Sequence, residues 1–97
     1  MLRINMPKEM IQSYSALNST SAIAAELAKW FDKIIDERKI RPNVKGEYIF
    51  ALLRSDFERF LGDRNFTNYL RIKLLSYGYS LRRYQQRAEV TVIKFLN

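Results

Sequence analysis

Asp32 and Asp36 are the pair of carboxylates whose spacing could bring two acids together, because residues four apart share one face of a helix. Lys29 and Lys33 lie beside them, and such a mixed run of charges is typical of a solvated helix surface. The chain has no histidine and no cysteine, so the usual general base near neutral pH and the commonest metal ligands are missing. Its three glycines form neither a P-loop nor a dinucleotide fingerprint. We therefore predict a non-enzyme with no catalytic residue, metal site or cofactor.

Basic residues gather in the last third of the chain. The net charge of the whole sequence is +7, and residues 63–97 hold seven basic and two acidic side chains. A small domain with this excess passes the first test for a protein that binds a polyanion. The distribution predicts nucleic acid as the partner, with DNA favoured over RNA. The alternative interpretation is that these charges only keep the surface soluble.

Arginine, asparagine and glutamine can bond two base-edge atoms at once, and the free N–H groups of a helix N-terminus can bond phosphate. On this chemistry we expect contacts from one helix, through Arg64, Asn65, Asn68, Arg71 and Lys73. We expect further contacts from the segment that follows, through Arg82, Arg83, Gln85, Gln86 and Arg87. Tyr77, Tyr79 and Tyr84 interleave with this second group, and they either stack on the bases of a single strand or pack against the core.

Four helices and a β-hairpin are expected to position these residues. Pro7 suits the first turn of a helix from Lys8 to about Leu17. Apolar residues at three- and four-residue spacing predict further helices over residues 22–38, 48–61 and 66–77. After Gly78 the period becomes two, so two strands with a tip near residues 85–88 are expected to form a hairpin.

The predicted fold class is mainly α with a C-terminal β-hairpin (α+β), in a single domain covering residues 1–97. Residues 1–40 form an N-terminal helical part and residues 45–97 a winged-helix part. The reason is the order of elements, since two helices joined by a tight turn that contains Gly62 and followed by a hairpin are typical of a winged helix-turn-helix. In that fold helix 66–77 enters the major groove and the hairpin is the wing.

The apolar runs of the chain are short. They reach four to six residues, as in Tyr48–Leu53, against the roughly 20 that a transmembrane helix needs. Lys8 and Glu9 interrupt the N-terminal segment before it could serve as a signal peptide. The sequence therefore predicts a cytoplasmic protein with no membrane partner.

The order of aromatic and glycine landmarks resembles the C-terminal domain of the poxvirus-type and phage/plasmid-type primase–helicases, over about residues 7–85. The matching landmarks are Pro7, Tyr14, Phe31, Tyr48, Phe57, Leu70, Leu74, Gly78 and Tyr79. This chain is compressed between Leu61 and Leu70 and lacks the family's ATPase, so helicase activity does not follow. The resemblance implies a winged-helix DNA-binding module associated with replication of a mobile element or virus.

Two other functions remain open. The first is a protein-interaction adaptor or inhibitor, with a replication protein as the partner. It would present Ile72 and Leu75, which project away from the helix spine. The second is a ribbon-helix-helix dimer, in which a strand at Leu2–Met6 would direct Arg3 and Asn5 into a DNA groove.

Overall fold

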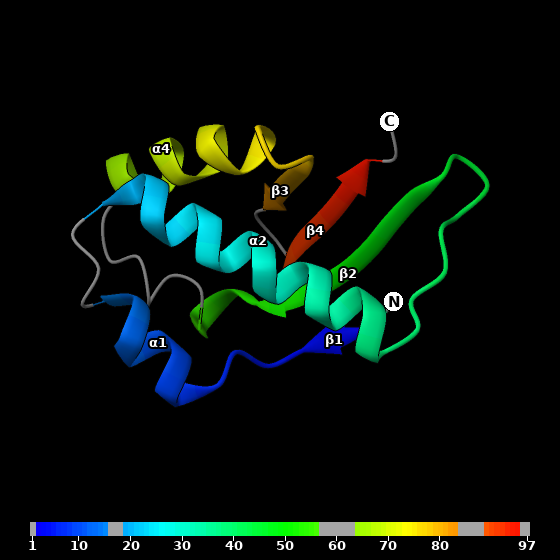
Figure 1. The fold of residues 1–97 in the computed structure, drawn as a ribbon, viewed down its shortest axis with the longest axis horizontal. Helices are drawn as coiled ribbons and strands as arrows, with labels where there is room; N and C mark the ends of the chain where they lie inside the picture. Colours follow the sequence, from blue (N-terminus) through cyan, green and yellow to red (C-terminus); the bar gives the residue numbers. More distant parts are fainter. Residues whose placement is uncertain (1, 16–18, 57–63, 84–88, 96–97) are drawn as a thin grey trace.

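The structure is a computed structural model, and it describes residues 2–15, 19–56, 64–83 and 89–95. Within these residues, three helices and four strands follow one another (Figure 1). In order they are β1 (Arg3–Ile4), α1 (Lys8–Ser15), α2 (Thr20–Glu37), β2 (Glu47–Leu53), α4 (Arg64–Leu75), β3 (Tyr79–Arg83) and β4 (Glu89–Phe95).

The strands form one mixed sheet in the order β1-β2-β4-β3. β1 pairs with β2 in parallel, whereas β2–β4 and β3–β4 are antiparallel pairs. The helices α2 and α4 lie side by side over one face of this sheet (Figure 1). No helix in the described ranges is long and apolar enough to cross a bilayer.

The prediction of a mainly α, winged helix-turn-helix protein is wrong. The chain is an α/β protein, with a four-stranded mixed sheet packed against two helices. The main error is β2, which occupies residues where the first helix of the expected helix-turn-helix should begin. Phe50, Ala51 and Leu52 are all fully buried there, and a strand buried on both faces is a continuous apolar run that periodicity cannot distinguish from a helix.

Other predicted elements are confirmed. The helix expected at residues 22–38 is α2, the one expected at 66–77 is α4, and the N-terminal helix is α1. The two strands after Gly78 are present and pair antiparallel as β3 and β4, while the predicted hairpin tip lies outside the described residues. The part of the expected helix 48–61 beyond residue 56 lies outside them too.

The core lies between the sheet and the helices, with Phe31 of α2 at its centre. The Phe31 ring lies 5.5 Å from the ring of Phe50 on β2 and 5.1 Å from that of Tyr79 on β3, measured between centroids. Leu70 and Leu74 of α4 are also fully buried. This packing fixes which side of α4 faces the sheet and which sides face the solvent.

Candidate nucleic-acid interface

The site is built on α4, whose buried stripe is Thr67, Leu70 and Leu74. These positions recur at three- and four-residue spacing, so they line one side of the helix. A second stripe at the same spacing is exposed and faces β3, and its members are Asn68, Arg71, Ile72 and Leu75. Because the buried stripe is anchored in the core, the exposed stripe is held in a fixed orientation.

A tight turn joins α4 to β3 and sets the distance between them. The amide of Tyr77 donates to the carbonyl of Leu74 and that of Gly78 to the carbonyl of Leu75, both at 3.0 Å. Gly78 has φ +84, a conformation that glycine adopts readily. The carbonyl of Gly78 then accepts from the amide of Phe95 at 3.0 Å, so β3 begins its pairing with β4 immediately after the helix.

β3 is an edge strand, because it ends the strand order. The Phe95 amide donates a hydrogen bond to the Gly78 carbonyl. Hydrogen-bonded pairs and non-hydrogen-bonded pairs alternate along an antiparallel ladder. Ser80 and Arg82 are therefore the residues of β3 whose backbone groups form hydrogen bonds with β4. The backbone N–H and C=O of Leu81 therefore point away from β4, toward the free edge. No strand of the described chain pairs with that edge.

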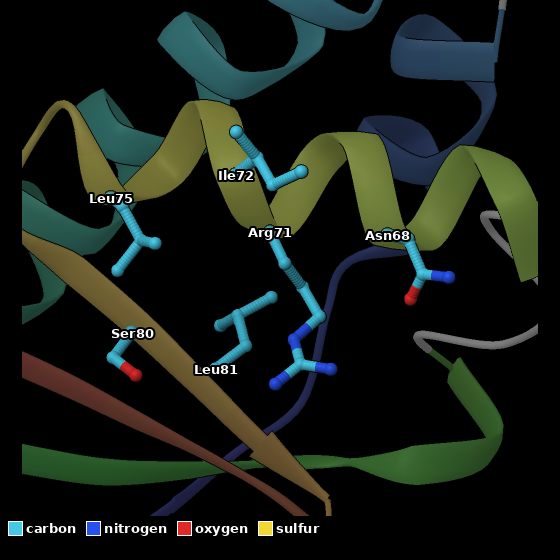
Figure 2. A pocket seen from close by; sticks show the side chains of 6 residues that line it. All are labelled: Asn68, Arg71, Ile72, Leu75, Ser80 and Leu81. Carbon is cyan, nitrogen blue, oxygen red and sulfur yellow. The ribbon is translucent and has the colours of Figure 1, made fainter.

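A groove of about 310 Å³ lies between α4 and this edge (Figure 2). Its lining consists of Asn68, Arg71, Ile72 and Leu75 from the helix and of Ser80 and Leu81 from the strand. In Figure 2 the Arg71 side chain extends from the helix toward the strand, and Leu75 lies above Ser80. The walls are mainly aliphatic, and a guanidinium group and an amide provide polar side chains beside them.

The charge of this region has one sign. From Arg64 to Arg83 there are five basic residues and no acidic one. Within the described part of the chain, no salt bridge forms on Arg71, Lys73 or Arg82. Some basic side chains elsewhere are paired, as in Lys33 with Glu37 on α2. The α4–β3 region is therefore a place where positive charge is available to an external anion.

A second hollow of about 440 Å³ lies at the end of α2, and its charges are mixed. Its lining residues are Asp32, Ile35, Asp36, Lys39, Ile40, Arg41, Tyr48 and Lys94. Two carboxylates there face three cations, and the Lys94 ammonium lies 2.7 Å from the Asp32 carboxylate. Since the acids offset the bases locally, this hollow favours a polyanion less than the α4–β3 groove does.

The structure brings together two of the predicted contact residues, Asn68 and Arg71, in the groove. Lys73 is exposed on α4 but lies outside the groove. Arg82 is exposed as well, and because side chains alternate along a strand it lies on the face of the sheet opposite to Leu81.

The remaining predicted contacts are placed by their elements. Arg64 and Asn65 form the first turn of α4, and Arg83 ends β3. Gln85, Gln86 and Arg87 lie outside the described residues, as does Tyr84.

Tyr79 belongs to the core, so of the two interpretations given for this residue the packing against the core is confirmed and the stacking on a base is wrong. It is 1% exposed, and its hydroxyl donates a hydrogen bond to the Asp32 carboxylate. Burial, together with the bond to Asp32 and the charge of that group, raises the pKa of Tyr79 far above its ordinary value. Tyr77 is exposed in the turn after α4 and remains able to stack.

The sequence reasoning missed three residues. Tyr69 is 64% exposed on α4, and its position next to the buried Leu70 could have revealed this. Ser80 and Leu81 line the groove, which no local pattern indicates because it depends on β3 being an edge strand beside α4.

The comparisons with known proteins give no relative. No protein family, curated protein or solved structure matches the chain. The resemblance to the primase–helicases therefore stays a prediction, and the winged-helix fold that it implied is replaced by the mixed sheet described above.

In this structure the strand that was considered for a ribbon-helix-helix dimer is β1, which pairs with β2 of its own chain. Ile4 is buried in the core. The Arg3 guanidinium binds the Glu89 carboxylate, with Nε 3.1 Å from Oε1. Arg3 is thus engaged within the chain, which disfavours its insertion into a DNA groove.

Proposed function

We propose that this protein binds nucleic acid, with DNA favoured, through the edge formed by α4 and β3. The observation that carries the proposal is the juxtaposition of Arg71 and Asn68 on one exposed stripe, in a twenty-residue stretch without an acidic side chain. Arginine bonds phosphate oxygens or base edges in pairs, and an amide offers both a donor and an acceptor.

The proposed role of the site is to bind nucleic acid, without catalysing a reaction. Lysine and arginine that contact phosphates release condensed counterions, so affinity for nucleic acid falls as salt rises. Arg71 is exposed and has no acidic partner among the described residues, so it has no ion pair with them to break before it meets a phosphate. This property distinguishes it from Lys94, which is already bonded to Asp32.

The test is fluorescence anisotropy of labelled single-stranded and duplex DNA over a salt series. The logarithm of the association constant should fall linearly with the logarithm of salt, by about 0.9 per phosphate contact on duplex and about 0.7 on single strands. Absence of binding to either form at low salt would contradict the proposal, as would binding that salt does not weaken.

A protein-binding role is the second candidate, and the exposed apolar side chains of α4 favour it. Tyr69, Ile72 and Leu75 are 64%, 62% and 57% exposed, and neighbouring exposed apolar residues mark interaction surfaces. A protein partner would be held mainly by these side chains. Removal of Arg71 would therefore leave the binding of a protein partner unchanged, whereas it would weaken the binding of nucleic acid.

A further inference from the structure

We infer, building on the proposed function, that the α4–β3 groove takes an unstacked base of a single-stranded nucleic acid. Ile72, Leu75 and Leu81 contact the faces of the base, and Arg71 holds the adjacent phosphate. A basic surface alone accounts for affinity toward any polyanion. Whether the groove prefers a single strand or a duplex depends on the other groups that line it.

The aliphatic walls are the first such feature. Ile72 and Leu75 lie next to Arg71 on the exposed stripe of α4, and all three line the same groove. A duplex offers this surface phosphates and polar base edges, because the flat faces of its bases are stacked inside. A single strand can turn its bases outward, and their faces can then lie against aromatic or apolar side chains.

Leu81 of β3 is the second feature. It lines the groove and is only 2% exposed, so it closes the groove as an apolar floor anchored in the core. The flat face of an unpaired base can lie against such a floor, whereas in a duplex that face is stacked between its neighbours.

The polar side chains of the groove are the third feature. The Arg71 side chain reaches from α4 toward the strand, and Asn68 lies one turn before it (Figure 2). A guanidinium there can bond two phosphate oxygens at once. Among the described residues that line the groove none is a carboxylate, so their charge complements the backbone of a nucleic acid. These three features together match a base with its own phosphate.

The experiment measures the affinity of labelled single-stranded DNA, of the same sequence annealed to its complement, and of the single strand with abasic positions. The variant carries Ile72→Gln and Leu75→Gln, which remove the apolar walls and leave the charge unchanged. Both side chains are largely exposed, so the fold should be retained. The matched control is Val44→Gln, since Val44 is an exposed aliphatic residue that is not part of the groove.

The expected result is that wild-type protein prefers the single strand to the duplex and to the abasic strand by about tenfold. The double variant should lose that preference, and the Val44 control should keep it. Equal affinity for single strand and duplex would overturn the inference. So would a double variant that binds the single strand as wild type does.

Failure of the inference is distinguishable from failure of the proposed function. If the double variant binds like wild type while Arg71→Ala still weakens binding, the α4–β3 edge binds nucleic acid but not through an unstacked base. If neither strand form binds at low salt, the proposed function fails and the inference with it.

Discussion

The hydroxyl of Tyr79 on β3 donates a hydrogen bond to the carboxylate of Asp32 on α2. The Lys94 ammonium on β4 bonds the same carboxylate oxygen at 2.7 Å. One acidic side chain thereby joins a helix to two strands of the sheet, at the side of the core where Tyr79 meets Phe31. This contact holds the edge strand β3 in the place where it borders the groove.

Removing the Tyr79 hydroxyl should weaken the fold. Tyr79→Phe keeps the ring in the core and deletes a hydrogen bond to a charged group, so we expect a loss of about 1 to 2 kcal/mol in the free energy of unfolding. Urea unfolding measures this as a lower midpoint with an unchanged slope. Tyr69→Phe is the control, because Tyr69 is exposed. An unchanged midpoint for Tyr79→Phe would show that the bond does not contribute.

The same contact makes stability depend on pH in the acid range. Partial burial alone would raise the pKa of Asp32, but the hydrogen bonds from Lys94 and Tyr79, with the charge of Lys94, outweigh it and lower the pKa below 3.8. The unfolded chain therefore takes up the proton first, so this stabilisation is present above pH 3.8 and is lost as pH falls through the folded-state pKa.

This predicts a specific pH profile for Asp32→Asn. The difference in free energy of unfolding between wild type and the variant should shrink as the pH is lowered from roughly 5 to 3. A difference between wild type and Asp32→Asn that stays constant across this range would contradict the assignment.

The turn before β3 depends on the backbone of Gly78. Its φ is +84, and a Cβ there would lie 3.7 Å from the Phe95 carbonyl oxygen, which is ordinary contact. Gly78→Ala should therefore lose stability through backbone strain alone, by about 1 to 3 kcal/mol. Gly78→Asn should lose less, because asparagine tolerates this region better than alanine. Equal thermal midpoints for wild type and Gly78→Ala would refute the account.

Local pattern in the sequence predicts α2 and α4 well, since Ile23, Leu27, Phe31 and Ile34 recur at helical spacing and become the buried face of α2. It fails at β2, where Phe50, Ala51 and Leu52 are apolar on both faces of the strand. What makes this segment a strand is pairing with residues far away in the chain, as in Ala51 with Arg3 and Thr91. A window of neighbouring residues does not contain that information.

The residues of the candidate site also fall into those that local sequence predicts and those that it does not. Asn68 and Arg71 were predicted, because they lie on one helix away from its buried spine. Leu81 was not, because its importance depends on β3 ending the sheet and on the turn that brings the strand back along α4. Arg82 was assigned to the same site, but it lies on the other face of the sheet from Leu81.

The central claim is that the α4–β3 edge binds nucleic acid, and a matched pair of charge deletions tests it most directly. Arg71→Ala and Lys45→Ala each remove one exposed positive charge, the first from the groove and the second from the loop before β2. Anisotropy over a salt series should show weaker binding and a salt slope reduced by about one for Arg71→Ala. Lys45→Ala should bind as wild type does. Equal losses in the two variants would mean that overall charge alone drives binding, and no loss in Arg71→Ala would contradict the assignment of the site.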